Sequence, residues 1–223
     1  MIKIFISDLD GTLIHKARNH VKPNMKNRKA LKKLDDNSIK LAVATGRLEK
    51  SIREVERNLQ IPLYKISVNG AVISDINDEI IHESFIPKKK EKEIIKKKKK
   101  KYMKNIYFYV LVTDKANNYF RPAVFISRFI NLFYKRRFNT IYLAKNHFRL
   151  FLSDVEKILK INIGTGREEK YMLLKDMSEE FSGTEIFITG SRSVEIGPEN
   201  NSKGTAVIKL LKHLGLNSEE AAY

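Results

Sequence analysis

The chain opens with Ile2-Lys3-Ile4-Phe5-Ile6-Ser7-Asp8-Leu9-Asp10-Gly11-Thr12-Leu13, an apolar run that ends in two carboxylates one residue apart. Such a run is typical of a strand buried on both faces of a parallel sheet. Asp8 and Asp10 then lie where the strand gives way to a loop. Because ligands bind at this end of the strands in open α/β sheets, the stretch predicts an α/β fold with a site at the two carboxylates.

Two further segments carry groups suited to binding phosphate. Ile39 to Ala44 is a second apolar run, and Thr45-Gly46-Arg47 follows it. Much later, Lys203 opens a segment with the apolar periodicity of a helix. A threonine hydroxyl, a glycine N–H and a lysine ammonium are all natural phosphate ligands.

The chemistry of phosphoryl transfer assigns a role to each of these groups. The reaction needs a nucleophile, a proton donor, and cations or N–H groups around the phosphate oxygens. Asp8 suits the nucleophile, through an aspartyl-phosphate, and Asp10 suits the general acid and base. Lys203 would stabilise both the phosphate and the intermediate. Gly11 allows a tight turn that brings Thr12 near the carboxylates.

Asp8 to Thr12, read as DxDGT, resembles the first motif of the haloacid dehalogenase superfamily of phosphohydrolases. Thr45-Gly46-Arg47 looks like the second motif of that family. Lys203, reached through Glu195-Ile196-Gly197-Pro198, resembles the third. An isolated Asp-x-Asp-Gly is usually a turn, but here the three motifs follow in the order of the family.

The resemblance implies a Mg²⁺-dependent phosphatase with Asp8, Asp10 and Lys203 as catalytic residues. It places the metal at Asp8 and Asp10. The substrate-binding residues that it implies are Thr12, Thr45, Gly46, Arg47 and Asn69.

Two of these residues have an equally good plain interpretation. Arg47 either contacts the substrate or pairs with a surface carboxylate. Asn69-Gly70-Ala71 resembles the Asn-Gly-Ala that follows the third core strand in one subgroup, and it also suits an ordinary type I′ or II turn.

The segment between Thr45-Gly46-Arg47 and Lys203 is far too long for a loop and must form a domain. This placement resembles the Cof-like sugar phosphatases, which insert an α/β cap after the third core strand. The implied architecture is a Rossmann-like parallel core sheet in residues 1–83 and 198–223, with an α+β cap domain in residues 84–197. In this family the cap selects the substrate, which is typically a small phosphorylated metabolite such as a sugar phosphate.

Periodicity and turn residues predict the individual elements. In the core we expect strands near residues 2–7, 40–44 and 65–68, and helices near 23–35, 48–59 and 203–213. In the cap we expect strands at 106–113, 149–151, 157–163 and 185–189, and helices at 125–137 and 168–181.

The fourth motif of the family, Gly-Asp-x-x-x-Asp or Gly-Asp-x-x-Asn-Asp, is absent from the 223 residues. The core sheet is therefore expected to be truncated at its C-terminus, with the strand of Asp8 as an open edge that favours self-association. Asp8 and the carbonyl of Asp10 would supply only part of a magnesium shell. We accordingly expect the phosphatase activity of this form to be weak or absent.

Composition is consistent with a globular enzyme. The chain is 42% hydrophobic, which can build a core, and it has no cysteine, which excludes disulfides and thiolate metal sites. No signal-peptide pattern is present, and the longest aliphatic-aromatic stretch, Ile106 to Val112, falls far short of the roughly 20 residues of a membrane helix. We expect a cytoplasmic protein without a membrane partner.

The net charge of +17 supports a competing hypothesis. Lys88 to Lys104 contains eleven lysines and two glutamates, and such a patch attracts phosphate polymers. The alternative is therefore a catalytically inactive basic protein that binds nucleic acid through this segment. Against it, the segment lacks the arginines and stacking aromatics of nucleic-acid sites. A lysine-rich helix at the start of the cap is the plainer interpretation.

Overall fold

The structure is a computed structural model that describes residues 1–14, 23–87, 106–113, 140–143, 158–165, 171, 183–189 and 193–223. The chain divides into two units. The first comprises Met1–Ser84 and Asn201–Tyr223, and the second comprises Phe85–Asn200. The chain thus leaves the first unit after Ser84 and re-enters it at Asn201.

The first unit contains a six-stranded sheet in the order β11-β1-β2-β3-β4-β5. The first four strands in this order are parallel, and β4 and β5 form an antiparallel extension. The predicted parallel α/β core is therefore confirmed. The bounds of the strands are β1 Ile4–Asp8, β2 Lys40–Ala44, β3 Tyr64–Ser67, β4 Val72–Ser74, β5 Ile80–Glu83 and β11 Ala221–Ala222.

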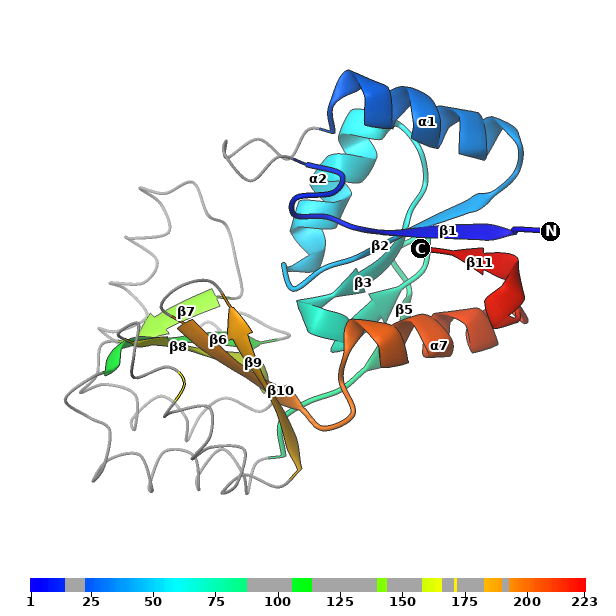
Figure 1. Ribbon diagram of the computed structural model, residues 1–223. Helices are drawn as coiled ribbons and strands as arrows, with labels where there is room; N and C mark the ends of the chain where they lie inside the picture. Colours follow the sequence, from blue (N-terminus) through cyan, green and yellow to red (C-terminus); the bar gives the residue numbers. More distant parts are fainter. Residues whose placement is uncertain are drawn as a thin grey trace. The chain divides into compact units, whose positions relative to one another are not determined.

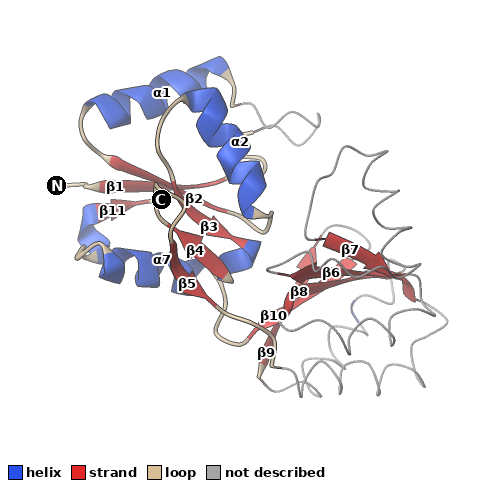
Figure 2. Ribbon diagram, turned by 180° about the vertical axis from the view of Figure 1, so that it is seen from behind, coloured by secondary structure: helices blue, strands red, loops and turns tan. Residues whose placement is uncertain are grey.

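Helices cover both faces of this sheet. α1 (Met25–Asp36) and α2 (Glu49–Leu59) lie on one face, and α7 (Lys203–His213) lies on the other, as Figures 1 and 2 show. The strand β1 is consequently buried on both sides, as its apolar sequence predicts. The three layers enclose two separate apolar clusters.

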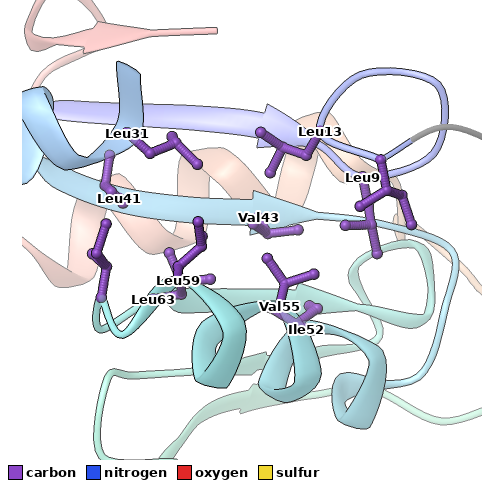
Figure 3. Close-up of a cluster of buried hydrophobic side chains, with 11 residues drawn as sticks. Leu9, Leu13, Leu31, Leu41, Val43, Ile52, Val55, Leu59 and Leu63 are labelled. Atoms are coloured by element: carbon purple, nitrogen blue, oxygen red, sulfur yellow. The ribbon is translucent and has the colours of Figure 1, made fainter. Parts of the chain in front are cut away.

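The larger cluster fills the space between the sheet and the helices α1 and α2 (Figure 3). The second cluster packs α7 against the opposite face, where Ile4 and Ile6 of β1 are 0% and 1% exposed. Burial of large aliphatic side chains on both faces stabilises the central strands by roughly 1.5–3 kcal/mol for each side chain. The first cluster comprises Leu9, Leu13, Ile14, Leu31, Leu41, Val43, Ile52, Val55, Leu59, Ile61 and Leu63.

The register of the parallel strands aligns their carboxyl ends. Asp8 of β1 lies opposite Ala44 of β2, and Ala44 lies opposite Ile66 of β3. The loops that follow these three strands therefore leave the sheet at the same end, the carboxyl end. The sequence predicts the site at this end.

The sequence predicts that β1 is an outermost strand of the sheet with unpaired backbone groups, and the structure differs from this prediction. β11 (Ala221–Ala222) lies parallel to β1 and pairs with it at Ile4 and Phe5. Just before this pair, the N–H of Lys3 donates to the carbonyl of Glu220 at 2.7 Å. The expectation of an open edge is thus wrong for the first half of β1, because the chain turns back after α7 and adds a short strand there.

The second unit contains an antiparallel five-stranded sheet in the order β7-β6-β8-β10-β9. Three of its strands match predicted segments, whereas β7 and β10 were not predicted. The expected second boundary at 197/198 falls within β10, which pairs with β9 through Pro198, and the second unit extends to Asn200. The bounds are β6 Ile106–Thr113, β7 Thr140–Leu143, β8 Ile158–Thr165, β9 Thr184–Thr189 and β10 Ser193–Pro198.

Several predictions fall on other parts of the chain. These predictions concern residues outside the described ranges: the strand at 149–151, the helix at 125–137 and the lysine-rich segment 88–104. Of the expected helix at 168–181, only residue 171 is described. Within the described ranges, no helix is both long enough and apolar enough to cross a membrane.

Candidate active site

The first carboxylate of the opening stretch meets the predicted lysine. Asp8 is the last residue of β1, and its Oδ1 lies 2.6 Å from Nζ of Lys203. Both side chains are partly exposed, at 29% and 34%. The fold therefore brings together two groups that are 195 positions apart, and it leaves them open to solvent.

Lys203 is held by the way in which α7 begins. Ser202 is the N-cap, and its Oγ accepts a hydrogen bond from the N–H of Thr205 at 3.1 Å. In return, Oγ1 of Thr205 accepts one from the N–H of Ser202 at 2.9 Å. This reciprocal capping box stabilises the first turn of the helix. The partial positive charge of the helix N-terminus adds to that of the ammonium group next to Asp8.

The second carboxylate has a cation of its own. Nε of Arg47 donates to Oδ2 of Asp10 at 2.8 Å, and Nη2 donates to Oδ1 at 2.5 Å. This is the bidentate geometry that favours arginine over lysine. Of the two interpretations of Arg47, pairing with a carboxylate is the one observed, but the carboxylate belongs to the candidate site.

The loop after β1 turns tightly at Gly11, whose φ is 84°. The N–H of Gly11 donates to the carbonyl of Ile14 at 2.9 Å. Asn27 on α1 secures the loop from outside, because its Nδ2 donates to the carbonyl of Thr12 at 3.0 Å. The predicted turn is present, but Thr12 is exposed, and among the described residues its side chain makes no hydrogen bond to either carboxylate. Nothing in the sequence singled out Asn27.

The loops after β2 and β3 are packed together. Thr45 is 1% exposed, and its carbonyl accepts from the N–H of Asn69 at 3.0 Å. A Cβ on Gly46 would lie 2.6 Å from Oδ1 of Asn69, so a larger residue there would have to displace the side chain of Asn69. Asn69 adopts φ 57° within a short 3-10 turn, a conformation that asparagine tolerates. Asn69 therefore lies in a turn, and this turn braces the loop of Thr45 and Gly46.

A magnesium ion could use only part of this donor set. Among the described residues, no group of three or more His, Asp or Glu could hold a metal ion. Both carboxylate oxygens of Asp10 face Arg47, whereas Lys203 engages one oxygen of Asp8. Mg²⁺ is commonly held by one or two carboxylates together with water and substrate phosphate. The carboxylate of Asp8 and the backbone carbonyl of Asp10 are oxygen donors of the kind that such a shell uses.

The sequence profile of the haloacid dehalogenase-like hydrolases matches residues 5–223. Phosphatase YwpJ of Bacillus subtilis is 34% identical over 89 residues, which are 40% of this chain and 30% of the relative. The chain thus aligns with less than a third of the length of that relative. The 5-amino-6-(5-phospho-D-ribitylamino)uracil phosphatase YwtE of Bacillus subtilis is 26% identical over 237 residues, covering 98% of this chain and 79% of the relative.

Solved structures share the fold. A haloacid dehalogenase-like hydrolase from Bacillus subtilis superposes with a TM-score of 0.73 at 22% identity, covering 99% of this chain and 81% of that one. The subclass IIB sugar phosphatase BT4131 gives a TM-score of 0.67 at 18% identity, covering 99% and 79%.

Proposed function

The chain belongs to the haloacid dehalogenase-like hydrolases, and we propose that it is a magnesium-dependent phosphatase that acts on a small phosphorylated metabolite. The observation that carries the proposal is the 2.6 Å contact between Asp8 and Lys203 at the carboxyl end of β1. A carboxylate beside an ammonium group, at the end of a strand whose following loop holds a second acid, is the set of groups that phosphoryl transfer through a carboxylate requires.

In the first step, an oxygen of Asp8 attacks phosphorus and forms the aspartyl-phosphate. The bond between phosphorus and the ester oxygen breaks, and its electron pair goes to the leaving oxygen. Asp10, in its protonated form, gives its proton to that oxygen. Lys203 stabilises the negative charge on the phosphoryl oxygens during the transfer.

In the second step, a water molecule attacks phosphorus, and the carboxylate of Asp10 accepts its proton. The bond between phosphorus and the oxygen of Asp8 breaks, which restores the nucleophile and releases inorganic phosphate. The same side chain thus acts first as an acid and then as a base.

Arg47 must change partner during this cycle. Because it engages both oxygens of Asp10, a proton can be carried on that carboxyl only after the guanidinium withdraws. The substrate phosphate is an alternative partner, since arginine binds phosphate as well as carboxylate in a bidentate manner. We infer that Arg47 moves from Asp10 to the substrate when the substrate binds.

A magnesium ion would be held by the carboxylate of Asp8 and the carbonyl of Asp10, together with an oxygen of the substrate phosphate. When bound, it would neutralise charge on the transferred phosphoryl group.

The relatives suggest where to look for the substrate. BT4131 is described as a sugar phosphatase, and the name of YwtE specifies a substrate with a phosphorylated ribityl chain. Both descriptions are compatible with a phosphate ester on a small polyhydroxylated carbon chain. We propose that this chain acts on the same class of compounds, with the second unit selecting among them.

The test is the release of inorganic phosphate from p-nitrophenyl phosphate and from a panel of sugar and polyol phosphates, with Mg²⁺ and with EDTA. Asp8→Asn should lower turnover by roughly 10³-fold or more, because it removes the nucleophile. Asp36→Asn, an exposed change on α1, is the matched control and should leave turnover unchanged. Magnesium-dependent turnover that survives in Asp8→Asn would overturn the mechanism. No turnover on any substrate is the result expected from the sequence without the fourth motif, and it would overturn the proposal that this chain is itself an active phosphatase.

A further inference from the structure

The two points at which the chain passes between its units are joined by a side-chain hydrogen bond. Ser84 is the last residue before the chain leaves the first unit, and Asn201 is the first after it returns. Oγ of Ser84 donates to Oδ1 of Asn201 at 3.0 Å, across 117 positions of sequence. The backbone of Ser84 is also fixed, since its N–H donates to the carbonyl of Ala71 at 2.8 Å.

Asn201 lies directly before the first turn of α7. The next residue, Ser202, is the N-cap of that helix, and the N–H groups of Thr205 and Ala206 donate to its Oγ at 3.1 Å and to its carbonyl at 3.0 Å. Lys203, the partner of Asp8, is the first residue of the helix. The position of Asn201 therefore bears on the position of the lysine.

The turn before β4, which contains Gly70, packs closely against the first turn of α7. Gly70 has φ 101°, and a Cβ there would lie 2.7 Å from the carbonyl of Ser202 and 2.8 Å from Cβ of Ala206. Backbone in such close contact has little freedom to shift. A displacement at Asn201 would thus pass into the first turn of α7 rather than be absorbed around it.

Burying the side chain of Asn201 at this position lowers the stability of the folded state. It is 2% exposed, and its Nδ2 has no hydrogen-bond partner among the described residues. A buried amide donor without a partner destabilises the folded state, whereas an apolar side chain of similar shape carries no such penalty. The contact that the polar side chain does make is the one to Ser84.

We propose that Ser84 and Asn201 form a junction clasp that holds the two crossing chains together on the first unit and so keeps Lys203 on Asp8. Without the clasp, any movement of the second unit would act through residue 201 on the first turn of α7. Asn201 is then a positioning residue for the reaction. The functional part of this inference rests on the proposed phosphatase activity, because it assigns Lys203 to the phosphoryl group.

The test uses Ser84→Ala, Asn201→Leu and the double variant in the full chain. In each, the amides of Thr205 and Ala206 should exchange with deuterium roughly five to ten times faster than in the wild type, because they donate to Ser202. Turnover should fall roughly tenfold, in kcat more than in KM, because binding residues are intact but Lys203 is less well placed. Ser51→Ala on α2 is the control and should change neither quantity.

The double variant decides whether the two residues act as one clasp. If they do, its effects should equal those of a single variant rather than their sum. Unchanged exchange at Thr205 and Ala206 in both single variants, or effects that add, would overturn the proposal. The exchange measurement needs no activity, so a wild type without turnover would reject the phosphatase assignment while the clasp is still tested.

Discussion

Replacing Lys65 by methionine should destabilise the first unit strongly, although the residue is only one of many lysines. Lys65 lies on β3 and is 0% exposed. Its Nζ lies 2.9 Å from the carbonyl of Leu63 and 3.2 Å from that of Asp75. It also lies 3.1 Å from Oε1 of Glu56 and 3.0 Å from Oδ1 of Asp78. This ammonium group thus ties α2 to β3 and to the turn between β4 and β5.

The size of the effect follows from what the substitution leaves behind. Methionine has nearly the same length, so the packing is kept, but two carboxylates and two carbonyls lose their donor. Removing one partner of a buried ion pair costs about 3–5 kcal/mol. The side chains of Glu56 and Asp78 are 20% and 38% exposed, so water can replace part of the lost interaction. We therefore expect a loss at the lower end, about 3 kcal/mol, which corresponds to a fall in Tm of about 6–12 °C.

The assay is urea unfolding followed by circular dichroism, with Lys29→Met as the matched control. Lys29 is exposed on α1, so the control should stay within about 0.5 kcal/mol of the wild type. The turnover of folded Lys65→Met should equal that of the wild type, since Lys65 makes no contact with the site residues among the interactions described. A stability within about 0.5 kcal/mol of the control would refute the reasoning.

Three further changes test other parts of the first unit. The pKa of His82 is lowered mainly by burial and further by the ammonium group of Lys209, which lies 2.9 Å from Nε2 of the imidazole. The unfolded chain then binds the proton more readily, so the free energy of unfolding should fall as pH drops below about 6.5, and His82→Gln should flatten this dependence in urea titrations between about pH 5 and 7. Gly70→Ala should lower the free energy of unfolding by about 1–3 kcal/mol, measured by thermal denaturation, because alanine fits neither the φ of 101° nor the space. Lysine cannot bind the substrate phosphate in the bidentate manner proposed for Arg47, so Arg47→Lys should lower kcat/KM for p-nitrophenyl phosphate by roughly 10- to 100-fold, with an unchanged value as the contrary result.

The elements that the sequence predicts well are those whose signal is local. Ile4, Phe5 and Ile6 are all apolar because they belong to the strand with a helix layer on each face. The helix that begins at Lys203 is marked in the sequence by its apolar period, and the structure adds the capping box of Ser202 and Thr205 at its first turn. Both patterns arise within a dozen residues, so no knowledge of the rest of the chain is needed to read them.

Features that depend on distant partners could not be predicted in this way. The strands β4 and β5 have three and four residues, too few for a period-two pattern to stand out. Lys65 looks like any surface lysine until β3, α2 and the turn before β5 are placed around it. Asp10 and Arg47 are 37 positions apart in the sequence, and the sequence alone does not indicate which carboxylate the arginine pairs with.

The pairing of charges in the site bears on the proposed dependence on magnesium. Asp8 faces Lys203 and Asp10 faces Arg47, so these four side chains carry no net charge when all are ionised. Protonating Asp10 for the first step leaves one positive charge, whereas a phosphate ester brings about two negative charges. The excess negative charge would oppose both binding and the approach of the carboxylate of Asp8 to phosphorus. The side chains alone therefore do not balance the transferred group, and a magnesium ion beside Asp8 is the simplest way to supply the missing positive charge.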